Sequence, residues 1–548
     1  MERYTFYYFE KAAFGGSAEG TGAGKMIRRF GQKQKKRVWW TGLFRIPAAI
    51  AAYVVGRWRS RTASQELASE AARLRLTAPA VSELKAGWLK LEALVLPGAG
   101  GQSPAAMKAA GGSAAPLPGG KGKPPAKSGA FAKPLQPADA EAALSPGTAP
   151  SPAGGGGWPA GAALGGAVPQ HPWAAPGIAD APAGAGWGAA ELALIERIRG
   201  EIVRHNRNNV TRTEAYRELY ARRPELHWAL LAHMVSRNSG WNMTDLQGEW
   251  LPRLLDNGKR KAVFGMLERA NALIFQDAYP QLLLYEAGLK AERSLFHLLP
   301  AFGVSAFMRP VWEQFARTGD AVPLTVALIV NEQHYIEHRI IGDSYYRKKV
   351  LGTLFFGVQA LLQLNQVVFP YGKEEDGRTQ LAGLVMENFS NLRERIEFGK
   401  RLYALLFGVP GVSAGVLRFV RSVRHTGSRA DYAPELFEPV RSGLPGKTYS
   451  GRIEAGRLKA GAQRLYSPPL ESAWPDRPVD PPEPGDWFGT AAEVLPYFRA
   501  LPLPESFEMT NEYGFALSKI EMAVMAVQQL GAGAGGAPVG AGARPSFD

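Results

Sequence analysis

Two histidines stand one helical turn apart, and a glutamate precedes the second, which gives the pattern H-x-x-E-H at residues 334–338. Residues four positions apart share a face of a helix, so His334 and His338 could bind one metal ion. Glu337 would then take a proton from a metal-bound water, as in zinc peptidases. A third ligand would have to come from elsewhere, and Glu387 or Glu394 in a later predicted helix could supply it.

A structural interpretation of the same motif is favoured. Wound as a helix, residues 323–341 place Asn331, His334 and His338 on one polar stripe, and apolar residues cover most of the remaining surface. This pattern is typical of a mostly buried helix with one solvated or hydrogen-bonded edge. We therefore favour a protein without a metal ion or cofactor, and this interpretation assigns no catalytic residue. The alternative is a metal-dependent hydrolase with Glu337 as base and with His334, His338 and Glu387 as ligands.

A second group of polar residues lies between residues 207 and 248. The helix that starts near Pro224 is predicted to end at Gly240, because glycine commonly follows the last helical turn. The candidate binding residues then surround a corner between two helices: His233, Arg237, Asn238, Trp241, Asn242 and Asp245. In a pocket there, Arg237 would contact an anion and Asp245 would be its counter-charge or a base. The favoured alternative is a hydrogen-bonded corner that only fixes the two helices.

The elements that would position these groups are helices. Residues 191–430 show successive helical patterns, and the longer apolar helices are predicted at 260–288, 323–341, 344–368 and 379–407. Strand alternation is nearly absent, so the predicted fold class is all-α, a multi-helix bundle. Residues 431–508 are proline-rich but carry aromatic side chains, and they are predicted to wrap the bundle as an extended arm. A terminal helix over 509–530 and a disordered tail over 531–548 follow.

Composition narrows the class of protein. The 548-residue chain is 46% hydrophobic and contains no cysteine, which excludes disulfides and thiol nucleophiles and favours a cytoplasmic location. Its net charge of +15 is uneven: residues 1–96 hold 17 Lys and Arg against 7 Asp and Glu, whereas residues 191–548 hold 42 against 39. This basic head, residues 1–96, favours an anionic partner, either a lipid surface or nucleic acid.

Residues 97–190 have the composition of a disordered linker. Alanine, glycine and proline fill 65 of these 94 positions, and branched apolar residues are nearly missing. Such a segment buries too little apolar surface to offset the entropy lost on ordering. As a flexible coil it would span roughly 50–60 Å. The head and the helical body are therefore expected to act on separate surfaces.

Residues 38–56 of the head are the candidate for membrane contact. Arg45 would cost about 2.5–3.5 kcal/mol at the membrane centre, which offsets the gain from the apolar residues, and Pro47 removes a helical hydrogen bond. Basic residues flank both ends, so a peripheral position at the inner face of the cell membrane is favoured over a span. The predicted lipid contacts are Arg28, Arg29, Trp39, Trp40 and Phe44. The alternatives are an ordinary packed helix and, less expected, a non-specific contact with nucleic-acid phosphates.

Four phrases of the sequence carry a family resemblance: NNVTRTEAY, HWALLAHMVSRNSGWNMTDLQG, VNEQHYIEHRII and YSPPLESAWPDRP. Together they resemble the YppC-like family of uncharacterised proteins from Bacillus-type bacteria, over about residues 191–490. That family has no assigned activity, so the resemblance gives no residue a role and implies only a bacterial, intracellular, helical protein. The expected function is a non-catalytic structural or interaction module, with a membrane surface or another protein as partner. The hydrolase and a nucleic-acid-associated protein are the alternatives.

Overall fold

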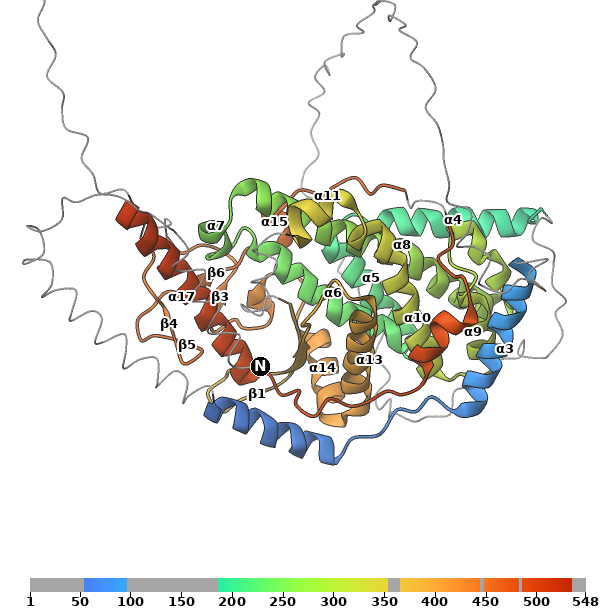
Figure 1. Ribbon diagram of the computed structural model, residues 1–548, viewed down its shortest axis with the longest axis horizontal. Helices are drawn as coiled ribbons and strands as arrows, with labels where there is room; N and C mark the ends of the chain where they lie inside the picture. The colour runs from blue at the N-terminus through green and yellow to red at the C-terminus, as the bar shows by residue number, and fades with distance from the viewer. Residues whose placement is uncertain (1–53, 96–185, 353–364, 444–447, 482–484, 535–548) are drawn as a thin grey trace, which may run out of the picture.

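The computed structural model describes residues 54–95, 186–352, 365–443, 448–481 and 485–534 (Figure 1). This part of the chain is mostly helical, which confirms the prediction of a largely helical protein. Several predictions lie outside the described residues: the five lipid-contact side chains of the head, nearly all of the linker 97–190, and the tail beyond residue 534.

Five helices form the centre of the described part of the molecule. They are α5 (Asn209–Arg222), α6 (His227–Asp245), α8 (Asn257–Ala291), α10 (Ala321–Ile336) and α13 (Leu392–Gly408). Four of them begin at a side-chain cap, because Asn208, Asp256, Asp320 and Asn391 accept hydrogen bonds from backbone N–H groups of the first turn. Helix α10 packs against both α8 and α13, and its residues 326–330 are buried.

The other named helices surround this centre. They are α3 (Ala78–Val95), α4 (Ala189–His205), α7 (Leu251–Leu254), η2 (Phe296–Phe302), α9 (Met308–Thr318), α11 (Ser344–Tyr346), α14 (Pro410–Ser422), η5 (Arg429–Asp431), α15 (Leu470–Ala473), α16 (Ala491–Val494), η6 (Leu495–Phe498) and α17 (Thr510–Ala534). Within the described ranges, no single helix has the length and apolar content of a membrane span. Helices α13 and α14 have that length and apolar content only when they are taken together, and their axes are bent by 89°.

A β-hairpin corrects the prediction of an all-α fold. Strands β1 (Gln366–Lys373) and β2 (Thr379–Val385) pair antiparallel where the ends of two helices, 344–368 and 379–407, were predicted. The run Val367, Val368 and Phe369 favours a strand, since β-branched and aromatic side chains fit a half-buried sheet. Gly377, with φ of +84°, provides the turn. An apolar run of this length can form either a helix or a strand, and the turn at Gly377 favours the strand.

Smaller irregular elements complete the fold. Short ladders pair β3 (Phe437–Glu438) with β6 (Leu465–Tyr466) in parallel and β4 (Ile453–Glu454) with β5 (Arg457–Leu458) antiparallel. Two π-helical turns, η3 (Glu337–Ile341) and η4 (Arg347–Leu351), follow α10 and α11. Turn η3 includes Glu337 and His338 of the H-x-x-E-H motif, so the spacing of the motif residues departs from that of a regular α-helix.

The described part of the basic head is packed on the body. The indole of Trp88 in α3 is fully buried, stacks on Phe307 with ring centroids 5.0 Å apart, and donates from Nε1 to the Phe307 carbonyl at 2.9 Å. A preceding helix over 54–69 is held by Ser60, whose hydroxyl donates to Oε2 of Glu508 at 2.8 Å. The expectation that the head and the body act on separate surfaces is therefore wrong for residues 54–95, because these contacts join them.

The proline-rich segment before α17 contacts the central helices through its tryptophans. Trp474 stacks on Phe264 of α8 at 4.2 Å between centroids, and its Nε1 donates to the carbonyl of Met243 in α6 at 2.9 Å. Trp487 stacks on His334 of α10, also at 4.2 Å. These rings fix the segment against one side of the helical centre.

Candidate functional site

A cavity of about 260 Å³ lies between the five central helices and β1. Each helix contributes residues spaced by three or four positions, so one face of each helix forms a wall. Helix α10, for example, presents Ile329, Glu332, Gln333 and Ile336. The wall is mainly apolar, and its larger side chains include Val235, Met266, Ile274, Phe398 and Leu402. A mostly apolar cavity with a few polar groups is typical of a site for a small molecule.

Glu332 is the one acidic side chain among the described residues of the wall. Burial raises the pKa of its carboxyl to about 8, against smaller opposing effects of hydrogen bonds from Gln333 and Trp228. The amide of Gln333 lies 3.2 Å from Glu332 Oε1. At neutral pH this carboxyl is therefore mostly protonated.

The two cationic side chains of the wall are already paired. Arg395 forms an ion pair with Glu337, and its Nε donates to Oε1 of Gln333 at 2.9 Å. Arg212 lies with Nη2 at 2.6 Å from Oε1 of Glu268, which is also buried. These pairs neutralise the positive charges and fix both guanidinium groups.

Asn365 adds an acceptor without a donor to the wall. Its Oδ1 is buried and has no hydrogen-bond partner within the described part of the chain. Its backbone carbonyl accepts from Met386 N at 3.1 Å, so the residue is held by the hairpin. A buried acceptor of this kind lacks the stabilisation that a donor would supply.

The H-x-x-E-H motif lies beside the cavity but is not assembled as a metal site. The carboxylate of Glu337 is taken up by Arg395, and His338 and Glu387 are exposed on the surface. Among the described residues, no group of three potential ligands is placed to hold a metal ion. The alternative prediction of a metal site at His334, His338 and Glu387 is therefore not supported by the geometry.

Two members of the polar stripe lie under Trp487. The ring of His334 is covered by the indole, and burial lowers the pKa of this histidine to about 4. The same indole donates from Nε1 to Oδ1 of Asn331 at 2.9 Å, and Asn331 is buried. His338 is exposed, His334 is partly buried and Asn331 is fully buried, so most of the stripe is a packed edge.

The predicted helix-to-helix corner does not exist, because α6 continues through Gly240 to Asp245. Gly240 is a point of close approach: a Cβ there would lie 2.6 Å from Oδ1 of Asn209 and 2.8 Å from Cε1 of His425. The glycine thus serves packing between α6, α5 and the loop after α14. Asn238 and Asn242 accordingly lie within a helix and line the cavity, whereas the other four candidate residues do not border it.

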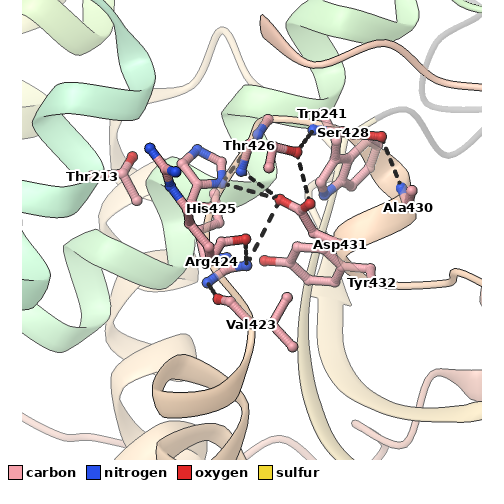
Figure 2. A network of polar contacts seen from close by, with 12 residues as sticks. Thr213, Trp241, Val423, Arg424, His425, Thr426, Ser428, Ala430, Asp431 and Tyr432 are labelled. Carbon is pink, nitrogen blue, oxygen red and sulfur yellow. Dashed lines mark hydrogen bonds and ion pairs between the residues drawn. The ribbon is translucent and has the colours of Figure 1, made fainter. Parts of the chain in front are cut away.

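Arg237 joins a buried polar network behind the cavity. Its Nη1 donates to the carbonyl of Val423 at 2.8 Å, and its Nη2 lies 3.8 Å from Oδ2 of Asp431. Figure 2 shows His425 and Thr426 converging on the same carboxylate, with the Thr426 hydroxyl donating at 2.7 Å. Burial acts to raise the pKa of Asp431, but hydrogen bonding to His425 and the charges of His425 and Arg237 lower it overall.

The remaining candidates bond within the protein. His233 is buried with Nδ1 at 2.8 Å from the carbonyl of Thr213, and burial lowers its pKa well below the usual range. Trp241 donates from Nε1 to Oδ1 of Asn238 at 3.2 Å. Asp245, partly exposed, pairs with Nε of Arg429 at 2.6 Å. These contacts fix α6 to its neighbours. The favoured prediction gave these residues such a structural role, but at a corner between two helices, whereas they lie along one continuous helix.

Sequence reasoning missed the polar groups of the cavity wall: Glu332, Gln333, Arg395 and Asn365. One signal was available. Glu332 and Gln333 lie beside the polar stripe and one turn from both Ile329 and Ile336 of the apolar face. An acid on the apolar face of a helix indicates either a buried ion pair or a site. Asn365 and Arg395 carry no such signal, because only the tertiary fold brings them to Glu332.

These features define a mostly helical protein with an internal, largely apolar cavity and a single unpaired acid in its wall. The chain belongs to the family described as protein of unknown function DUF2515, whose model matches residues 204–515. It is 36% identical over 322 residues to the uncharacterized protein YppC of Bacillus subtilis strain 168, which covers 58% of this chain and 91% of the relative. No solved structure matches significantly. The resemblance noted in the sequence is confirmed, and the matched region includes the cavity.

Proposed function

We propose that this protein is a non-catalytic binding module that holds a small, largely apolar molecule in its central cavity. The observation that carries the proposal is the wall itself, in which apolar faces of several helices surround a few polar groups. A well-packed interior contains few voids of this size unless a ligand or water occupies them. The proposal thus explains why long, well-capped helices leave space at their centre.

A non-catalytic role is favoured by the state of the polar side chains. His425 and Asp431 lie in the buried network, and the two arginines of the wall are held in ion pairs. The serines of the described cavity wall are Ser236 and Ser239. The described wall contains no histidine that could act as their base. The wall therefore offers recognition groups and no activated nucleophile.

Ligand-observed NMR with n-propylbenzene tests the cavity. Saturation transfer to this neutral apolar probe is expected with the full chain. It should be lost in Ala232→Phe and Ala270→Phe, which fill the cavity from α6 and α8, and kept in Ala193→Phe on the exposed face of α4. Circular dichroism checks that all variants fold. Equal binding by all of them, or none by the wild type, would remove the proposal.

Association with an anionic membrane surface is a second candidate function, favoured by the helix over 54–69. Its Val54 and Trp58 are 58% and 68% exposed, and Arg59 and Arg61 are exposed beside them. Tryptophan, apolar and basic side chains together are typical of a helix that lies at a lipid interface. This helix continues the sequence predicted to contact lipid and is fixed to the body by Ser60.

Flotation with anionic vesicles tests this candidate. Binding by the wild type should weaken with salt and fall in the Val54→Ser, Trp58→Ser double variant. Leu94→Ser is the control, since Leu94 is a 74% exposed apolar residue on α3. Point variants are preferable to deletion of residues 26–61, because deletion would also remove the contact of Ser60 with Glu508. Equal flotation of both variants would exclude this helix, and displacement of vesicles by duplex DNA would favour nucleic acid instead.

A further inference from the structure

We propose that the ligand of the cavity is an organic cation, an ammonium group with N–H donors on an apolar body, bound by the carboxylate of Glu332. The inference rests on the proposed binding function and gives it a substrate class. Three properties of the wall carry it: its charge, its acceptors and its aromatic rings.

The charge of the wall is complementary to a cation. The charges of Arg212 and Arg395 are compensated by Glu268 and Glu337, although Nε of Arg212 has no hydrogen-bond partner among the described residues. Glu332 faces the same cavity, and the protein places no cationic side chain in contact with it among the described residues. An ammonium group would supply the missing counter-charge, and charge-assisted hydrogen bonds are the strong ones in a site of low polarity.

The acceptors of the wall require a donor. Oδ1 of Asn365 is buried and has no partner among the described residues, and the carboxyl of Glu332 has acceptor capacity beyond its contacts with Gln333 and Trp228. An ammonium group carries up to three N–H donors and no acceptor, which fits this imbalance. An anionic ligand without N–H or O–H donors would leave both of these acceptors without a partner, which costs free energy in a buried site.

Aromatic rings line the same wall. Tyr216 and Trp228 pack edge to face with centroids 5.4 Å apart, and both border the cavity. The face of an aromatic ring attracts a cation, most strongly when the cation is removed from water. Phe398 and the aliphatic side chains offer surface for an apolar body.

The titration of Glu332 gives the inference a distinctive signature. The groups packed around it are Asp277 from α8, Tyr216 and Arg212 from α5, and Arg395 from α13. Burial raises the pKa of Glu332 to about 8 and that of Asp277 to about 7. The two arginines do not keep Glu332 ionised, because each is paired with another carboxylate. An ammonium ion that binds at pH 7 must displace the proton of Glu332, and binding therefore releases close to one proton.

Isothermal titration calorimetry on the full chain with three matched probes tests the inference. The probes are 2-phenylethylammonium, its neutral analogue n-propylbenzene and the anion 3-phenylpropionate. We expect the cation to bind at least about tenfold more tightly than either analogue. Titration at pH 7 in two buffers of different ionisation enthalpy should report proton release, which declines at pH 9 as Glu332 ionises in the free protein.

Glu332→Gln should remove the preference for the cation and the proton release while it retains n-propylbenzene. Glu394→Gln, at an exposed carboxylate of α13, should change neither. If n-propylbenzene binds without any preference for the cation, or the cation binds without proton release, the inference is wrong and the proposed function stands. If no probe binds the wild type, both are wrong. The wild-type proton release decides the matter even if Glu332→Gln fails to fold.

Discussion

The side chain of Asn238 bonds to both backbone polar groups of Val368. Its Oδ1 accepts from the Val368 N–H, and its Nδ2 donates to the Val368 carbonyl, each at 3.0 Å. Both residues are buried. Helix α6 thus satisfies the edge of β1 that β2 does not cover, in the manner of a neighbouring strand.

Replacing Asn238 with alanine should be costly, because it leaves two buried backbone groups of Val368 unsatisfied. We expect the free energy of unfolding to fall by about 2–4 kcal/mol. Urea denaturation measures the change. Asn388→Ala, at an exposed asparagine, is the matched control and should stay within about 0.5 kcal/mol of the wild type. Equal effects at both positions would contradict the bidentate contact.

Gly240→Ala should destabilise the protein although alanine is the better helix former. The new methyl group would meet Asn209 at 2.6 Å and His425 at 2.8 Å, so the helices must separate, and overpacking costs about 1–3 kcal/mol. Gly200→Ala in α4 is the control, because nothing lies within 4 Å of its Cβ position. That change should stabilise by about 0.5–1 kcal/mol. The two variants are therefore expected to shift the urea midpoint in opposite directions.

Stability should decline with pH between 6.5 and 8 because of Glu332. Its pKa is raised from 4.5 to about 8, so the folded state holds a proton that the unfolded chain has released. This contribution is complete below pH 4.5 and is lost as pH rises through 8, with a slope of about 1.4 kcal/mol per pH unit. Buried Asp277, with a pKa raised from 3.8 to about 7, adds to the decline in the lower part of this window. Buried His227 and His334, with pKa values lowered from 6.5 to about 4, act in the opposite sense and only below pH 6.5.

Urea denaturation at several pH values checks this slope. Glu332→Gln should flatten the decline between pH 6.5 and 8, whereas Glu394→Gln should reproduce the wild-type curve. A wild-type curve that rises across this window would show that Glu332 is ionised in the folded protein. Its carboxyl would then have a partner other than the one assigned here.

Trp88→Ala should separate α3 from the body. The indole is fully buried against Phe307, and loss of such a ring costs about 3–5 kcal/mol. Leu94→Ala on the same helix should have little effect, because its side chain is 74% exposed. Limited proteolysis provides the readout: cleavage within 78–95 should accelerate in Trp88→Ala alone. Rapid cleavage there in the wild type would contradict the packing.

The sequence predicted the helical character and the polar residues of α6, but not how they are used. Apolar periodicity is a local property, so the helices now named α8 and α10 were found close to their true bounds. Gly240 was read as a stop, because a glycine needed for close approach to His425 has the same local appearance. The hairpin was missed since Val367–Phe369 suits a helix or a strand until the Gly377 turn is considered.

The cavity could not have been predicted from the sequence. Glu332, Asn365 and Arg395 come from three elements, and only the packing of α10 against α13 and β1 brings them to one space. The H-x-x-E-H motif, in contrast, was conspicuous in sequence, yet Glu337 serves as the ion-pair partner of Arg395. Local spacing identifies what a helix face carries, whereas the partner across the interface determines what that face does.

The bond between Ser60 and Glu508 joins residues 448 positions apart, and Ser64 accepts from the N–H groups of Phe507 and Glu508 nearby. The helix over 54–69 therefore emerges early from the ribosome but finds its partner only when almost the whole chain has been synthesised. Contacts of such long sequence separation slow folding, because the intervening chain must be organised first. The exposed Trp58 face would then be free for chaperones, or for lipid, throughout translation, and its docking would mark the final step of assembly.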